Sequence, residues 1–201
     1  MNIKAKFVFL GDSQVGKTSI IVRYKQNEFD YNIITTVGNM SYDTTLTVNN
    51  RPVELQINDT AGQERYRSMT SVHFKDAQII ALVYDVTNEE TIYSLKNWIE
   101  QVEQDSKVRN VIFLVGNKAD LLEVESIDSA EIDETVQELM DKYNLPHLFT
   151  SAKSNINIKE LFVKSTEEAL KRNIFDDSVR ETVPLTQQNL QKKKTEGGGC
   201  C

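Results

Sequence analysis

Cysteine is almost absent from this chain of 201 residues, and its two copies, Cys200 and Cys201, are the last two residues. A body without cysteine has neither a disulfide framework nor a zinc site with cysteine ligands, which fits a reducing compartment. No apolar run approaches the ~20 residues that a membrane-spanning helix needs. Basic charge is not in surplus either, because the formal net charge is −7. The surface as a whole therefore lacks the footprint of a nucleic-acid-binding protein.

Short apolar runs alternate with helical patterns over residues 1–172. The runs typical of buried strands lie at 7–10, 79–84 and 111–115, and the helical spacings follow at 91–102, 132–140 and 158–170. This alternation predicts a mostly parallel sheet with helices on both faces. Two strand-like runs around Asn49-Asn50-Arg51-Pro52 predict a hairpin, which adds one antiparallel edge strand. We expect one folded domain over 1–172 and a polar, flexible tail over 173–201.

The segment GDSQVGKT has glycine, glycine, lysine and threonine at the spacing of a phosphate-binding loop, as Gly11, Gly16, Lys17 and Thr18. Glycine lets backbone N–H groups approach a phosphate closely, and the helix that follows points the positive end of its dipole at the same anion. The lysine reaches the outer phosphates and the hydroxyl can ligate Mg²⁺. The alternative is a glycine-rich turn between a strand and a helix that binds nothing.

The segment NDTAGQER follows the second hairpin strand. Asp59 stands at the strand end, where a carboxylate holds magnesium in phosphate-loop proteins. Gly62 could donate its N–H to a γ-phosphate, and Gln63 could orient an attacking water. The alternative is a polar loop whose Asp and Thr cap a helix.

Two more segments, GNKAD and TSAK, each follow a strand. The Asp120 carboxylate can accept hydrogen bonds from both donors of a guanine edge, Asn117 can contact N7, and the Lys118 stem can cover the base plane. The TSAK segment, residues 150–153, could donate backbone N–H groups to O6. The alternatives are a turn and a helix cap. Ligands of open α/β sheets bind outside the carboxyl ends of the strands, where all four segments would lie.

Taken together, GDSQVGKTS, TTVG, DTAGQERYRSMT, LVYDVTN, GNKAD, TSAK and the closing Cys-Cys make residues 4–172 and the tail resemble the Rab family of small GTPases, within the Ras superfamily. The run NIKELF is similar to the Golgi-type Rabs. The resemblance implies a phosphate-loop fold with a six-stranded, mostly parallel sheet, one antiparallel edge strand and helices on both faces. It also implies a monomer.

The resemblance carries site roles onto this chain. Gln63 and Lys17 would be catalytic, and Thr18, Thr36 and Asp59 would hold Mg²⁺. Phe29 matches the aromatic that packs edge-on against guanine; otherwise it is an ordinary buried phenylalanine. The implied GTP and GDP contacts are Ser13, Gln14, Val15, Gly16, Lys17, Thr18, Ser19, Phe29, Thr36, Gly62, Asn117, Lys118, Asp120, Ser151, Ala152 and Lys153.

The implied function is a GTP/GDP switch in vesicle trafficking on the cytoplasmic face of Golgi or endosomal membranes, cycling with the cytosol. Its implied partners are an exchange factor, an activating protein, effectors, a GDP-dissociation inhibitor and a prenylation escort, without nucleic acid. Cys200 and Cys201 match the geranylgeranylated pair, and two lipid chains anchor stably where one does not. The alternative is an unmodified pair of thiols. Lysines 192–194 could add attraction to anionic lipid, or form a solvated charge run.

The chain departs from the usual Rab pattern at two aromatic positions, where it has Ser41 and Asn58. We expect the usual effector set to change, with Phe74 keeping a third place in an exposed aromatic cluster. Gln14 is also uncommon in the phosphate loop, and we expect slow intrinsic hydrolysis, of the order of ~10⁻⁴ s⁻¹. Three rival functions remain: a GTP-binding module without turnover, a phosphate-loop kinase, and a nucleic-acid binder. The intact Asp59 and Gln63, the lack of an arginine-rich lid and the acidic balance disfavour them in turn.

Overall fold

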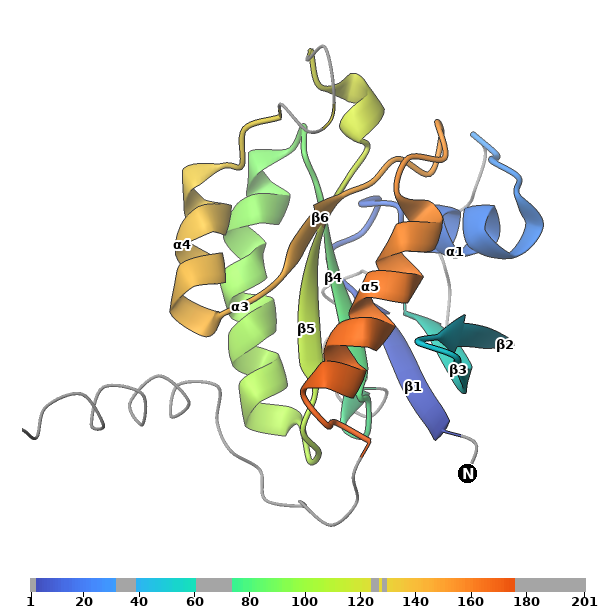
Figure 1. Cartoon of the computed structure of the whole chain (residues 1–201). Coiled ribbons are helices and arrows are strands. Elements are labelled where there is room, and N and C mark those ends of the chain that lie inside the picture. Colours follow the sequence, from blue (N-terminus) through green and yellow to red (C-terminus); the bar gives the residue numbers. More distant parts are fainter. Residues whose placement is uncertain (1–2, 32–38, 61–73, 124–126, 128–129, 176–201) are drawn as a thin grey trace, which may run out of the picture.

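The computed structural model describes residues 3–31, 39–60, 74–123, 127 and 130–175 (Figure 1). Its strands are β1 (Ile3–Leu10), β2 (Asn39–Val48), β3 (Arg51–Thr60), β4 (Ile79–Asp85), β5 (Val111–Asn117) and β6 (His147–Phe149). Its helices are α1 (Lys17–Gln26), α3 (Glu89–Asp105), α4 (Glu134–Tyr143) and α5 (Ile158–Lys171), with the short 3₁₀ helix η2 (Ala119–Leu121). No helix in these ranges is long and apolar enough to cross a membrane.

The six strands form one sheet in the order β2-β3-β1-β4-β5-β6. The pair β2–β3 is antiparallel and the other four pairs are parallel, so the predicted fold class is confirmed. Every residue of β4 and β5 is buried. That explains their continuous apolar sequences, since a strand covered on both faces has no solvent-facing side that would require alternating polar residues.

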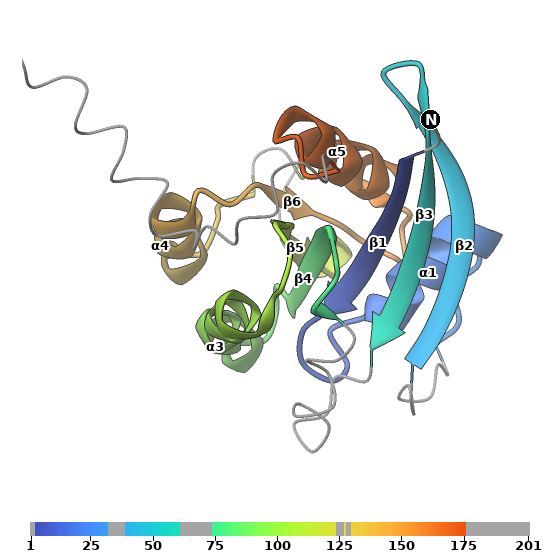
Figure 2. The same ribbon diagram turned by 90° about the horizontal axis from the view of Figure 1, so that it is seen from below.

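Alternate residues of the central strands pack into two separate cores. Phe7 and Phe9 face the core that α1 and α5 cover, whereas Val8 and Leu10 face the core beneath α3 and α4. Figure 2 shows the two helix layers on opposite faces of the sheet. The phosphate-loop segment therefore runs from a doubly buried strand into α1, and this anchors its two ends.

The hairpin turn is tighter than predicted. Asn49 and Asn50 both have positive φ, at 50° and 60°, and Arg51 already pairs with Val48 in the sheet. The predicted four-residue turn is wrong, because two successive left-handed residues close a hairpin by themselves and asparagine tolerates that conformation. β3 therefore begins at Arg51, and its other end reaches the site edge of the sheet at Asp59 and Thr60.

Candidate functional site

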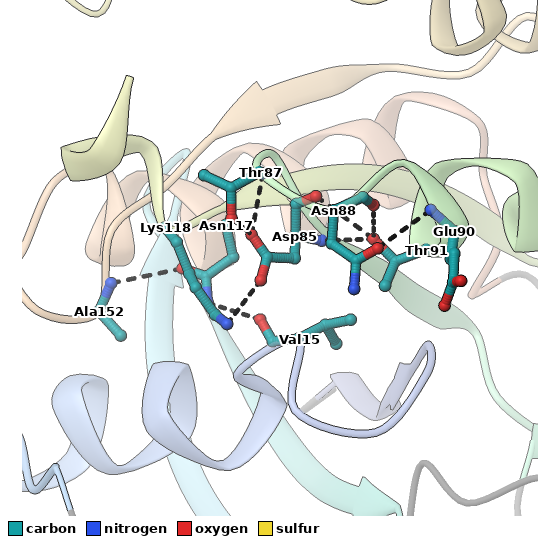
Figure 3. Close-up of polar contacts among 9 residues, drawn as sticks. All are labelled: Val15, Asp85, Thr87, Asn88, Glu90, Thr91, Asn117, Lys118 and Ala152. Carbon is teal, nitrogen blue, oxygen red and sulfur yellow. Dashed lines mark hydrogen bonds and ion pairs between the residues drawn. The ribbon is translucent and has the colours of Figure 1, made fainter. Parts of the chain in front are cut away.

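The predicted site segments meet at one edge of the sheet. The parallel strands β1, β3, β4, β5 and β6 end there, so the loops that follow them are neighbours. The connection is direct: the Asn117 side-chain amide donates from Nδ2 to the Val15 carbonyl oxygen at 2.8 Å (Figure 3). The loop after β1 and the loop after β5, about a hundred residues apart in sequence, therefore form a single site.

Close packing explains the two glycines of the phosphate loop. Gly11 has φ 131°, and a Cβ there would overlap the carbonyl oxygen of Val83. Gly16 has φ 95°, and a Cβ there would overlap the Asn117 amide nitrogen. Both positions exclude larger residues by conformation and by space. Between them Gln14 adopts φ 65°, so this loop also places a non-glycine residue in the left-handed region.

Lys17 begins α1 and is almost buried, at 5% exposure. Its Nζ donates to the carbonyl oxygens of Gly11 at 2.8 Å and Asp12 at 2.6 Å. Burial lowers the pKa of Lys17 to about 8, although the Asp59 and Asp12 carboxylates act in the opposite direction. The ammonium is thus held against the loop that would surround a phosphate chain.

Thr18 and Asp59 place oxygen atoms that could ligate a metal ion close to that lysine. The Thr18 hydroxyl donates to Oδ2 of Asp59 at 2.6 Å, and Asp59 is fully buried at the end of β3. Within the described ranges, no group of three His, Cys, Asp or Glu residues could hold a metal ion. A hydroxyl and one carboxylate fit Mg²⁺, which usually takes its other ligands from phosphates and water. Thr36, the third predicted ligand, lies outside the described residues.

Asn117 is 2% exposed and its amide joins three segments. Besides the bond to Val15, its Oδ1 accepts from the Thr150 hydroxyl at 3.3 Å and from the Ala152 N–H at 3.4 Å. The side chain thereby ties the phosphate loop to the TSAK segment. Its predicted contact with N7 of a base stays a prediction.

The predicted base-reading carboxylate is held by the TSAK segment. The Ser151 hydroxyl donates to Oδ1 of Asp120 at 2.5 Å, and Nζ of Lys153 lies 3.7 Å from Oδ2. A carboxylate at this position can accept hydrogen bonds from two donors of a guanine edge. Phe29 is half-buried and meets the Tyr31 ring edge-on, with ring centroids 5.0 Å apart.

Lys118 adopts φ 64° just after β5, and its Nζ lies 2.6 Å from Oδ2 of Asp85 at the end of β4. Burial alone would raise the pKa of the Asp85 carboxyl, but hydrogen bonds from Lys118 and Thr87 hold that pKa below its ordinary value. Figure 3 shows Asp85 between Lys118 and Thr87, on the side of α3. The sequence motif LVYDVTN contains this carboxylate, but no role was predicted for it.

Sequence reasoning also missed two supporting residues. The Arg23 guanidinium donates to the carbonyl oxygens of Ala152 at 2.7 Å, Lys153 at 3.0 Å and Asn27 at 2.7 Å. Trp98 on α3 donates its indole N–H to Oδ1 of Asp12 at 2.9 Å. The contacts of Arg23 with the TSAK segment span 129 and 130 sequence positions. No local pattern can indicate such contacts, because they exist only in the folded sheet.

The remaining predictions divide into three groups. Ser13, Gln14 and Val15 lie in the loop before α1, and Ser19 lies in the first turn of that helix. The predictions for Thr36, Gly62, Gln63, Cys200 and Cys201 fall outside the described residues. The prediction for Phe74 is wrong: this side chain is fully buried with Val8 and Leu10 and cannot belong to an exposed cluster.

The comparisons with known proteins agree with this arrangement. The model of the Ras family matches residues 6–171. The chain is 36% identical over 197 residues to the Ras-related protein Rab-8B of Dictyostelium discoideum, covering 98% of this chain and 92% of that one. It is 36% identical over 180 residues to RAB1BV of Beta vulgaris, covering 89% and 82%. It is 33% identical over 201 residues to RABE1d of Arabidopsis thaliana, covering 98% and 91%.

Proposed function

The chain belongs to the Ras family as a Rab-type small GTPase that hydrolyses GTP, and we propose that it is a slow, membrane-tethered switch in endomembrane trafficking. One observation carries the proposal: Asn117 binds both the phosphate loop and the TSAK segment. Nucleotide chemistry at one end and base recognition at the other are thereby joined through a single buried amide.

The residues of the phosphate loop bind the triphosphate. Backbone N–H groups of residues 13–18 surround the phosphates, and the Lys17 ammonium moves from carbonyl oxygens to phosphate oxygens. Thr18 and Asp59, with Thr36, would hold Mg²⁺, which neutralises charge on the phosphates when it is bound. Asp120 accepts from the two donors of guanine, Lys118 covers its plane, and the TSAK N–H groups reach O6.

Hydrolysis follows from positioning and charge. Gln63 orients a water in line with the γ-phosphorus, and Lys17 stabilises the negative charge that develops on the transferred group. The intrinsic rate is of the low order ~10⁻⁴ s⁻¹ seen for unassisted small GTPases. No arginine in the matched motifs stands where a built-in arginine finger would, so an activating protein has to supply one. Residues around 36 and 62–66, which lie outside the described residues, would respond to the γ-phosphate, so that effectors distinguish the GTP state from the GDP state.

Membrane attachment lies in the tail. Residues 1–172 act as the GTPase domain, while residues 173–201 carry Cys200 and Cys201 for two prenyl chains. An escort protein and a GDP-dissociation inhibitor would handle the lipidated form, which cycles between cytosol and the cytoplasmic face of Golgi or endosomal membranes. Cell fractionation of a Cys200→Ser/Cys201→Ser double variant tests this part: the variant becomes cytosolic, and an unchanged membrane fraction contradicts the tether.

The effector surface differs from the usual Rab pattern. In the sheet, Ser41 pairs with Asn58, and Asn58 is 7% exposed with its Nδ2 donating to the Gln56 carbonyl oxygen at 3.1 Å. Neither residue offers an aromatic anchor, and aromatic residues commonly dominate interfaces. We therefore expect effectors that do not depend on those two aromatic positions.

The decisive experiment follows nucleotide retention and turnover. The purified chain is loaded with γ-labelled GTP and Mg²⁺ and challenged with excess ATP or GTP, while phosphate release is recorded. Retention against ATP, loss to GTP and slow phosphate release are expected. Displacement by ATP contradicts guanine reading by Asp120, whereas retention of GTP without any release favours a binding module over an enzyme.

A further inference from the structure

Asp85 is a buried charged residue without a role in the GTP binding and hydrolysis proposed for this chain. It ends β4 at the edge of the sheet where the site lies, and it is 7% exposed. A buried carboxylate is costly unless its oxygens are paired, so each partner of Asp85 matters. Its partners come from two directions, namely α3 on one side and the predicted base-binding loop on the other (Figure 3).

The first carboxylate oxygen is fixed from the α3 side. Oδ1 of Asp85 accepts from the Thr87 N–H at 3.0 Å and from the Thr87 hydroxyl at 2.7 Å. The backbone is fixed too, because the Asp85 N–H donates to the Thr91 hydroxyl at 3.0 Å, and that hydroxyl donates to the Asn88 carbonyl oxygen at 2.7 Å. Asn88 caps α3 by accepting the Glu90 N–H. The carboxylate thus has one orientation before any ligand arrives.

The second oxygen faces the base-binding loop. Oδ2 lies 2.6 Å from Nζ of Lys118, whose side chain is 35% exposed. The strands hold the two residues in place, since Asp85 pairs with Asn117 in the sheet and the Val86 N–H donates to the Asn117 carbonyl oxygen at 3.1 Å. The only adjustable part of the pair is the lysine stem, which has four rotatable carbons and considerable rotamer entropy when it lacks a partner.

We propose that Asp85 is a positioning residue for nucleotide binding, which holds the Lys118 ammonium so that the lysine stem lies ready across the base plane. This inference rests on the nucleotide-binding roles proposed above for Lys118 and Asp120. A stem that covers a ring makes the same contact with any purine, whereas Asp120 reads the ring edge. Asp85 therefore slows release of the nucleotide without choosing the base.

The test compares dissociation of GDP and IDP, each carrying a fluorescent ribose label, from wild-type chain and from Asp85→Asn. Hypoxanthine lacks the exocyclic amine of guanine, so IDP loses one donor to Asp120 and reports edge reading. The variant keeps the size of the side chain and an acceptor for Thr87, but loses the charge. We expect both dissociation rates to rise about tenfold and by the same factor, the order that suits a lysine regaining part of its rotamer entropy.

A second variant separates positioning from general stability. Lys118→Met keeps the apolar stem but removes the ammonium, so adding Asp85→Asn to it raises the GDP rate less than twofold. Asp133→Asn is the matched control, because Asp133 caps α4 by accepting the Thr135 N–H at 2.9 Å. We expect GDP to dissociate from this variant at the wild-type rate. The same increase in both backgrounds means that Asp85 acts on the fold and overturns the proposal.

Other outcomes are equally decisive. An unchanged GDP rate in Asp85→Asn, or a change for GDP alone, also overturns it. If Asp85→Asn is insoluble, Thr87→Val is used instead, because it loosens the same carboxylate. A GDP dissociation rate that rises about threefold in the wild-type background, but not in the Lys118→Met background, supports the proposal. No increase there contradicts it. Failure of the wild-type chain to hold GDP would instead contradict the proposed function, so the two failures are distinguishable.

Discussion

The two halves of the site are supported in different ways. In the phosphate half, Lys17 bonds to Gly11 and Asp12, carbonyl groups only six and five positions away. In the base half, Ser151 reaches Asp120 across 31 positions and Arg23 reaches Ala152 across 129. The Lys17 contacts lie within the phosphate loop, although Trp98 and Asn117 also bond to that loop from distant elements. The contacts that hold Asp120 and the TSAK segment all join distant segments. Damage to the first half should be severe and local, and damage to the second should be graded.

The largest effect should come from Lys17→Met. The change leaves the stem but removes the buried ammonium that would meet the phosphates, and charged hydrogen bonds of this kind are the strong ones in phosphate sites. We expect GTP hydrolysis to fall about hundredfold or more, with a matching loss of GDP retention. Single-turnover phosphate release and filter binding measure the two quantities.

Lys25→Met is the control for that change. Lys25 lies on the same helix and its Nζ donates to the Asp43 carbonyl oxygen at 2.9 Å, at the surface. Its loss should leave both quantities within a factor of two, because exposed polar contacts contribute little. Hydrolysis by Lys17→Met at more than a tenth of the wild-type rate would contradict the role of this lysine.

Asn117→Ala breaks the connection between the halves and should have the next largest effect. It leaves the Val15 carbonyl and the Ala152 N–H buried without their partner, at a cost of about 1–3 kcal/mol each. We expect faster GDP release and a lower midpoint of urea unfolding. Asn110→Ala, just before the start of the same strand, removes comparable bonds to Ser106 and Val108 and should spare GDP release. Equal release from the two variants would mean that the halves are not coupled through Asn117.

The same contrast explains what the sequence could predict. Gly11, Gly16, Lys17 and Thr18 lie within eight residues and face one ligand, so their spacing alone indicates chemistry. The sheet was predictable because the fully buried β4 and β5 are continuous apolar runs. The exposure of single side chains was not predictable, because an aromatic residue such as Phe74 looks the same in the sequence whether it lies in a core or in an exposed cluster.

Contacts between distant segments were also beyond prediction. Asp85 and Lys118 lie at the ends of neighbouring strands, but the order of strands in the sheet is a property of the whole fold. The predicted length of the hairpin turn was wrong for a related reason. Asn49 and Asn50 already close it, and Arg51 and Pro52, which look like turn residues, belong to β3 because they pair with β2.

Arg23→Gln should have a moderate effect, confined to the base half. The variant loses the fork that holds the Ala152 and Lys153 carbonyl oxygens, so the TSAK segment loses a fixed position beside the base. We expect GDP release to rise about tenfold, with hydrolysis of bound GTP within a factor of two. Stopped-flow release and single-turnover hydrolysis separate the two.

The matched control is Arg172→Gln. Arg172 also bridges a helix to a distant carbonyl, since its Nη2 donates to the Asn144 oxygen at 3.2 Å, but it lies at the end of α5 away from the TSAK segment. Its loss should lower stability without changing release. An increase in release from both variants would indicate a general loosening of the fold and would remove the distinction between the halves.

The smallest effect concerns acid stability beneath the base half. The His147 Nε2 lies 2.9 Å from the Tyr84 hydroxyl, and burial lowers the pKa of His147 from 6.5 to about 4. Between these values the unfolded chain binds more protons than the folded one, so stability rises with pH there. The contribution is complete above pH 6.5 and is lost as the pH falls toward 4. We expect a loss of about 1 kcal/mol between pH 7.5 and 5.5, measured by urea unfolding.

His147→Gln should remove this part of the pH dependence, because glutamine does not titrate and can still bond to Tyr84. The other histidine of the chain, His73, provides the control: His73→Gln should keep the dependence. Tyr84 and Phe149 both approach the position where a Cβ on Gly116 would stand, directly before Asn117, so charging His147 should disturb the base half first. If GDP release accelerates at pH 5.5 in wild type but not in His147→Gln, the base half is disturbed first, as expected. Equal acceleration in both would show that the acid-sensitive group is not His147.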